Sequence, residues 1–129
     1  MALDSKAPKG YRKAWNGGVR PVTGVDLIAS ERLRQMDVER WTPEHDDRHS
    51  DGTLSAAACC YAALARRQAD GTIQNTTDGM PPPGGWPWDE EWWKPDDDPI
   101  RNLEKAGALI AAEIDRLQRQ IARAEVSRK

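Results

Sequence analysis

The spacing of apolar residues predicts three helices separated by polar, proline-rich connections. In residues 24–40 the apolar positions recur on one helix face: Val25, Ala29, Leu33 and Met36, with Ile28 beside them. Thr23 can cap this helix, and Asp26 stands where a capping box places its acidic partner. The opposite face is charged and is expected to face solvent.

Two later segments predict the second and third helices. Residues 53–69 are rich in alanine, the best helix former, and carry one apolar stripe: Leu54, Ala58, Tyr61 and Ala65. In residues 99–125, Asp98 suits the N-cap and Pro99 the first helical position. The stripe of this third helix is long and typical of a packed face: Leu103, Ala106, Ile110, Ile114, Leu117 and Ile121. Gly107 interrupts it and is expected to mark a close helix crossing.

No segment has a strong strand pattern, so we expect an all-α fold. The predicted architecture is a small single domain of three main helices over residues 23–125, with a long Trp/Pro-rich loop in residues 71–98. Residues 1–22 combine Gly, Pro, Lys and Arg without a period. They predict an irregular N-terminal arm, docked by Tyr11 and Trp15.

Charge and hydropathy exclude several classes of protein. The chain of 129 residues has a net charge of -2 and a pI of about 5.7, which argues against a duplex nucleic-acid binder. No apolar run is long enough to span a membrane, and no secretory signal is visible. Adjacent Cys59 and Cys60 point apart on a helix, so they are expected to be small buried residues in a reducing cytoplasm, without a mutual disulfide.

The first candidate site is the polar loop of residues 41–52, "WTPEHDDRHSDG". Its candidate ligand-binding residues are Trp41, Glu44, His45, Asp46, Asp47, Arg48 and His49. The zinc pattern H-E-x-x-H is not met, because Asp46 rather than Glu follows His45. Three interpretations stay open: contacts to a ligand, a carboxylate-rich Mg²⁺ site, or acids that cap a helical turn or pair with neighbouring arginines.

The second candidate site is the tryptophan segment of residues 86–98, "WPWDEEWWKPDDD". The chain has six Trp and no Phe, and four of the Trp lie in this segment. Trp86 and Trp88 share one side of an extended chain, whereas Trp92 and Trp93 point apart, so that one can anchor the loop and the other stay free. An indole face beside Lys94 suits a base with phosphates. Alternatively, the rings cover one end of the helices.

The order of these motifs resembles a family of small proteins of bacteriophages and prophages, mostly without an assigned activity. The shared motifs are "WTPEHDDRH", "WPWDEEWWKP" and "KAGALIAAEIDRL", and the resemblance covers residues 27–117. Where this family's pattern leads us to expect Gly before Trp41, this chain has Arg40. The resemblance implies a phage accessory protein working in the host bacterial cytoplasm. Residues 31–64 show a fainter similarity to the ryanodine-receptor repeat domain, a module suspected of contacting nucleotide-like ligands.

The leading hypothesis is a non-enzymatic protein that sequesters a small nucleotide-type ligand, such as a host immune signal, without cofactor, metal or catalytic residues. Trp41, Trp88 and Trp92 would stack on the ligand, while Arg48, Lys94 and Arg101 would meet phosphates. His45, Asp46 and Asp47 would contact ribose or base. A homo-oligomer is a further expectation, because one small subunit rarely encloses a ligand.

Two alternatives remain. The first is a Mg²⁺-dependent nucleotide pyrophosphohydrolase of all-α type, whose metal would be held by Glu44, Asp47, Glu113 and Asp115. The second is a protein–protein adaptor whose tryptophans contact a host factor.

Overall fold

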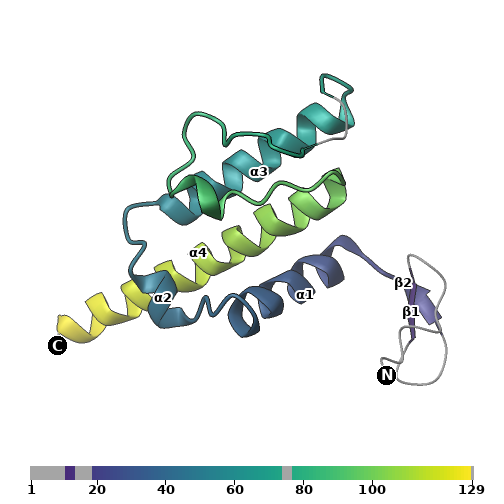
Figure 1. The fold of residues 1–129 in the computed structure, drawn as a ribbon. Helices are drawn as coiled ribbons and strands as arrows, with labels where there is room; N and C mark the ends of the chain where they lie inside the picture. The colour runs from purple at the N-terminus through teal and green to yellow at the C-terminus, as the bar shows by residue number, and fades with distance from the viewer. Residues whose placement is uncertain (1–10, 14–18, 74–76, 129) are drawn as a thin grey trace.

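The computed structural model describes residues 11–13, 19–73 and 77–128, and its body is all-α, as predicted (Figure 1). Three main helices form this body: α1 (Gly24–Asp37), α3 (Thr53–Ala69) and α4 (Pro99–Ser127). A short helix α2 (Pro43–Asp47) and a 3-10 turn η2 (Glu90–Trp92) lie in the connections. Within these residues no helix is both long and apolar enough to cross a membrane.

Helix α4 is the central element, with α3 on one side and α1 on the other (Figure 1). The core lies mainly between α3 and α4. It consists of Leu54, Ala57, Ala58, Cys60, Tyr61, Leu64, Trp93, Ala106, Leu109 and Ala112. Alanines on both helices allow a close approach, and the predicted apolar stripe of α3 is buried throughout.

The predicted packing face of α4 is wrong. Its large apolar residues Leu103, Ile110, Ile114, Leu117 and Ile121 are 40–61% exposed, and Ala106 alone in that stripe is buried. The helix instead turns smaller residues, such as Ala108 and Ala112, toward the interior. The alanine-rich surface of α3 admits small side chains at close range, which leaves the bulky stripe on an open face.

The predicted faces of α1 are also wrong. Val25 and Leu33 are exposed, whereas Glu31 and Gln35 are buried. The carboxylate of Glu31 accepts from Arg34 at 2.8 Å and pairs with Arg101 at 2.7 Å. Burial by itself raises the pKa of Glu31, but the hydrogen bonds from Arg34 and Arg101 outweigh it and hold that pKa below its usual value. Ion pairing therefore accounts for much of the α1–α4 contact, beside the packing of Ile28 on Gly107.

The ends of α1 and the crossing at Gly107 follow local chemistry. Thr23 and Asp26 form the expected capping box. The helix ends at Asp37 rather than at residue 40, because Arg40 adopts a left-handed φ of 62° and turns the chain. A Cβ added at Gly107 would lie 2.6 Å from Cδ1 of Ile28, so this glycine does mark a close helix crossing.

The N-terminal segment contains a short antiparallel pair, β1 (Tyr11–Lys13) and β2 (Val19–Pro21), with Tyr11 opposite Pro21. The expectation of an irregular arm is wrong for these six residues. Tyr and Val favour strands, and the sequence between them contains Asn16-Gly17, a strong hairpin signal. The predicted docking by Trp15 and the Tyr11 side chain lies outside the described residues.

Neither cysteine forms a disulfide, as expected, and Cys60 is buried. Cys59 is exposed, contrary to its predicted burial, because its position on α3 points away from α4.

Candidate functional site

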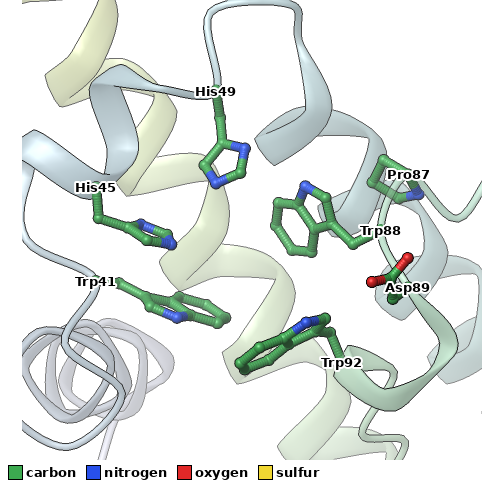
Figure 2. Close-up of a pocket in the computed structure, with 7 residues that line it drawn as sticks. All are labelled: Trp41, His45, His49, Pro87, Trp88, Asp89 and Trp92. Carbon is green, nitrogen blue, oxygen red and sulfur yellow. The ribbon is translucent and has the colours of Figure 1, made fainter.

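The polar loop and the tryptophan segment meet in one cavity of about 410 Å³, here called the aromatic pocket (Figure 2). Its lining residues are Trp41, His45, His49, Pro87, Trp88, Asp89 and Trp92. Five of these were predicted from the sequence as ligand-binding residues. A concave, mostly aromatic wall with a few polar groups is the usual form of a small-molecule site.

Helix α2 sets the positions of the two histidines. Thr42 is extended and caps the helix by accepting from the His45 N–H at 3.3 Å, and Pro43 occupies the first turn. The ring of His45 stacks on Trp41 with a centroid distance of 5.7 Å and an interplanar angle of 1°. The ring of His49 packs edge-on against His45 at 4.9 Å and lies 5.2 Å from Trp88. The two imidazoles thus form one wall of the pocket (Figure 2).

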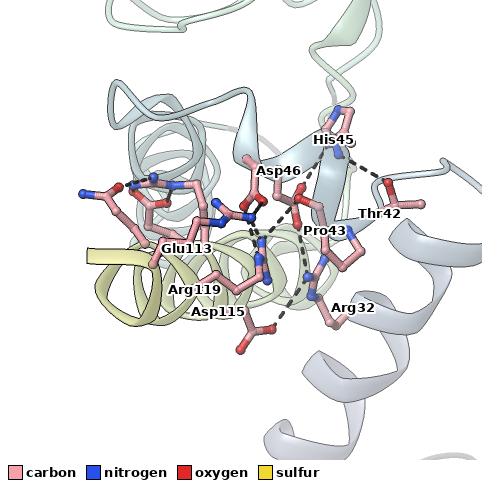
Figure 3. A network of polar contacts seen from close by, with 12 residues as sticks. Arg32, Thr42, Pro43, His45, Asp46, Glu113, Asp115 and Arg119 are labelled. Atoms are coloured by element: carbon pink, nitrogen blue, oxygen red, sulfur yellow. Dashed lines mark hydrogen bonds and ion pairs between the residues drawn. The ribbon is translucent and has the colours of Figure 1, made fainter. Parts of the chain in front are cut away.

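Two acids hold α2 against the long helices (Figure 3). Asp46 is fully buried, and one of its oxygens accepts from Arg32 of α1 at 3.1 Å. Its other oxygen lies 3.0 Å from Nδ1 of His45. Because a carboxylate only accepts, this nitrogen carries the proton, which fixes the imidazole ring. Asp46 therefore positions His45 and does not line the cavity.

Asp47 ties the same helix to α4. It accepts from Arg119 at 2.8 Å and from Arg123 at 2.6 Å. Hydrogen bonds from Arg119, then from Arg123, lower the pKa of Asp47. Like Asp46, Asp47 positions α2 and is not among the lining residues.

The tryptophan segment is anchored by the rings that face the core. Trp93 is 6% exposed and stacks on Tyr61 at 4.8 Å, and Trp86 packs edge-on against both rings. The Tyr61 hydroxyl accepts from the Lys94 N–H at 3.0 Å. Trp92, by contrast, is 48% exposed. The sequence predicted that one indole of the pair 92–93 anchors the loop and the other stays free. This prediction is confirmed, with Trp93 as the anchor and Trp92 as the free ring.

A second cavity of about 290 Å³, here called the charged cavity, adjoins the aromatic pocket and shares Trp41 and Trp92 with it. Its other lining residues are Glu31, Arg34, Gln35, Glu39, Tyr61, Lys94, Asp96, Arg101, Lys105 and Leu109. Lys94 and Arg101, both predicted from the sequence to meet phosphates, therefore lie next to the aromatic pocket.

The cations of the charged cavity differ in their partners. Arg34 pairs with Glu31 and Glu39, and Arg101 pairs with Glu31 and Glu104. In the part of the chain that the structure describes, neither Lys94 nor Lys105 forms an ion pair. The Lys105 ammonium donates to the Lys94 carbonyl and lies 5.6 Å from the centre of the Tyr61 ring. Burial, and then the charge of Arg101, lower the pKa of Lys105. An anion entering here would meet two ammonium groups that have no ion-pair partner among the described residues, with the carboxylate of Asp96 in the same lining.

Some predicted site residues lie elsewhere. Glu44 and Arg48 are exposed and line neither cavity, because α2 points them outward. Sequence reasoning missed Asp89 and Pro87 in the aromatic pocket and Lys105 in the charged cavity. Asp89 and Pro87 lie among the tryptophans, so the position of the segment could have indicated them. Lys105 has no local signal, since its role depends on how α4 is turned.

The four acids of the hydrolase alternative do not gather. Asp47 is paired with Arg119 and Arg123, and Glu113 is paired with Arg116 at 2.5 Å. Among the described residues there is no group of three or more His, Cys, Asp or Glu side chains placed to hold a metal ion.

No protein-family model matches the chain, and comparison with curated proteins and with solved structures gives no match.

Proposed function

We propose that this protein binds and sequesters a small nucleotide-type ligand. The base would occupy the aromatic pocket, and the phosphates would enter the charged cavity. The observation that carries the proposal is that Trp41 and Trp92 line both cavities. A stacking surface and a group of cations therefore lie side by side, as a nucleotide requires.

The aromatic pocket supports the base-binding half of this proposal. Trp92 is half exposed, so its ring is open to a planar ligand. His45 and His49 offer ring nitrogens, and Asp89 offers a carboxylate, to the polar edge of a base or to a ribose. These groups surround the rings without filling the cavity (Figure 2).

The charged cavity supports the phosphate-binding half. Lys94 and Lys105 have no carboxylate partner among the described residues, and Arg101 lies beside them. The arginines of this cavity already have carboxylate partners, since both pair with Glu31 and each has a second acid, Glu39 or Glu104. A phosphate would offset the charge of the two lysines and gain charge-assisted hydrogen bonds.

Sequestration is favoured over hydrolysis because the two acids of α2 that face the long helices are engaged by arginines, and Asp89 contributes a single lining carboxylate, with no group of three potential metal ligands among the described residues. Asp46 and Asp47 bind arginines of α1 and α4, and catalysis would require carboxylates free to hold a metal or activate water. The resemblance to phage proteins suggests a biological setting: a phage accessory protein in the host cytoplasm that removes a nucleotide signal of host immunity.

Ligand recovery tests this proposal. The protein would be mixed with a panel of nucleotides, including cyclic dinucleotides and ADP-ribose derivatives, with Mg²⁺ present. After removal of unbound material and heat denaturation, mass spectrometry would identify what is released. We expect one nucleotide to be recovered intact and in stoichiometric amount. Release of a shortened product would show that the protein hydrolyses the nucleotide instead of sequestering it. Release of no nucleotide would favour the adaptor alternative.

A double variant separately tests whether the lysines of the charged cavity bind the phosphates. Lys94→Ala combined with Lys105→Ala should weaken nucleotide binding at least tenfold and reduce its salt dependence. The matched control is Arg66→Ala, which removes an exposed cation on α3 that lines neither cavity. Equal affinity in the double variant and the control would remove the charged cavity from the site.

A further inference from the structure

Helix α4 carries a row of large apolar side chains on a face that the other helices leave open. Six of them are at least 40% exposed: Ile100, Leu103, Ile110, Ile114, Leu117 and Ile121. Single exposed apolar residues are ordinary, but a continuous row along one helix is typical of an interaction surface.

The spacing of this row fits another helix. Two series repeat every seven residues: Ile100, Gly107, Ile114 and Ile121, and Leu103, Ile110, Leu117 and Ala124. Ile28 of α1 covers Gly107, so this position lies at the edge of the seam and the other seven form its open part. Together the two series advance in alternating steps of three and four, the a and d positions of a coiled-coil seam. None of these eight positions is charged, so the seam suits a second apolar seam better than a polar ligand.

The length of α4 gives a second argument. Its last buried residue is Arg116, yet the helix continues to Ser127 and projects beyond α3 (Figure 1). An isolated helix of about ten residues is marginal in water. Leu117 and Ile121 lie on this projection, where packing against another helix would stabilise it.

We infer that the protein forms a symmetric dimer in which the α4 helices of two copies pack along this seam. The seam is about 36 Å long at 1.5 Å per residue. Six half-exposed aliphatic side chains leave roughly 500 Å² open on each copy, so these side chains alone bury up to about 1,000 Å² in the dimer, the area that a biological interface should reach.

Charge favours an antiparallel arrangement. Three acids, Asp96, Asp97 and Asp98, precede the start of α4, whereas Arg123 and Arg128 are exposed near its end, each also paired with one acid of its own copy, Asp47 and Glu125 respectively. An antiparallel dimer places each acidic end beside the basic end of the other copy, and it also pairs the helix dipoles favourably.

The dimer leaves the proposed ligand site open. Lys105, in the charged cavity, is two residues from Leu103 and so lies on the opposite side of α4. The dimer therefore stands independently of the proposed function and does not depend on enclosure of a ligand.

Sedimentation velocity or light scattering of the full chain tests the inference. The wild type should have twice the chain mass of 14.4 kDa. Ile114→Glu should give a monomer with unchanged helical circular dichroism, because Ile114 is exposed within one copy. The control Ala122→Glu, on the same helix outside the seam, should remain a dimer.

A monomeric wild type, or a dimeric Ile114→Glu protein, would overturn the inference. Ile110→Lys provides a second variant should Ile114→Glu misfold.

A spin label tests the orientation. Ala124→Cys in a Cys59→Ser background places one label at the end of each seam, since the remaining Cys60 is buried. The antiparallel dimer predicts a label separation of about 35 Å, set by the seam length. A separation near 10 Å, the spacing of packed helices, would overturn the antiparallel arrangement.

Discussion

The side-chain amide of Asn102 donates to Oε1 of Gln68 at 2.8 Å, joining α4 to α3 inside the protein. The two residues also hold the end of the tryptophan segment. Oδ1 of Asn102 accepts from the Asp96 N–H at 2.9 Å, and Nε2 of Gln68 donates to the carbonyls of Asp96 and Asp97. Both side chains are buried, so these hydrogen bonds are shielded from water.

Replacement of Asn102 should therefore destabilise the fold. Asn102→Leu leaves the Asp96 N–H and the Gln68 amide oxygen without partners, at a cost of about 2–3 kcal/mol in the free energy of unfolding. Urea denaturation followed by circular dichroism measures the change. Gln118→Leu, an exposed substitution on the same helix, should change stability by less than about 0.5 kcal/mol. Equal effects of the two variants would contradict the structural role of Asn102.

Trp92 provides the most direct test of the aromatic pocket. Trp92→Ala should weaken nucleotide binding by about 1–3 kcal/mol, or about 5- to 150-fold in Kd, because a stacked base loses its partner. Trp92→Phe should keep most of the affinity. Both variants should fold normally, since the ring is half exposed and outside the core. Isothermal titration calorimetry gives the affinities, and an unchanged Kd for Trp92→Ala would rule out stacking on this ring.

The parts that the sequence predicted well depend on local chemistry. The caps at Thr23 and Asp98 and the alanine-rich stripe of α3 follow from residue type and spacing. The opposite directions of Trp92 and Trp93 follow from chain geometry. The tryptophan segment meets the polar loop although some forty residues separate them in the chain. No sequence pattern directly indicated this contact, and we expected it only because both segments have an unusual composition for a small helical protein.

The parts that the sequence predicted poorly depend on which face a helix turns inward. On α4 the large residues form the clearest stripe, yet small residues such as Ala112 pack inside, whereas Ile110 and Ile114 are half exposed. On α1 the stripe residues Val25 and Leu33 are exposed, and an ion pair between buried Glu31 and partly exposed Arg101 contributes to the contact with α4. Periodicity identifies an amphipathic helix but does not say whether its apolar face meets its own domain or another chain.

His49 should make stability depend on pH. Burial, followed by the nearby charge of His45, lowers the pKa of His49 below its usual 6.5. The unfolded chain binds this proton more readily than the folded chain does. The contribution of neutral His49 to the free energy of unfolding is therefore fully present above about pH 6.5 and is lost as the pH falls through the lowered pKa. Thermal unfolding between pH 8 and pH 5 should show a falling Tm, with a smaller fall in His49→Gln. An identical pH profile in the two proteins would contradict the shift.

Arg40 should be a site where glycine stabilises the protein. Its φ of 62° is left-handed, a conformation that costs a side-chain-bearing residue about 1–2 kcal/mol relative to its usual conformations. The turn must be kept, because it lets the Trp41 N–H donate to the Gln35 carbonyl at 2.9 Å and directs Trp41 toward both cavities. Arg40→Gly relieves the strain but adds freedom to the unfolded chain, so the net gain in the free energy of unfolding should be about 0.5–1 kcal/mol.

Arg48→Gly is the matched control. Arg48 has an ordinary φ of -75°, so this variant relieves no strain and should be less stable than the wild type. Thermal unfolding of both variants decides the question, and a lower Tm for Arg40→Gly would show that the arginine side chain contributes more than its backbone strain costs.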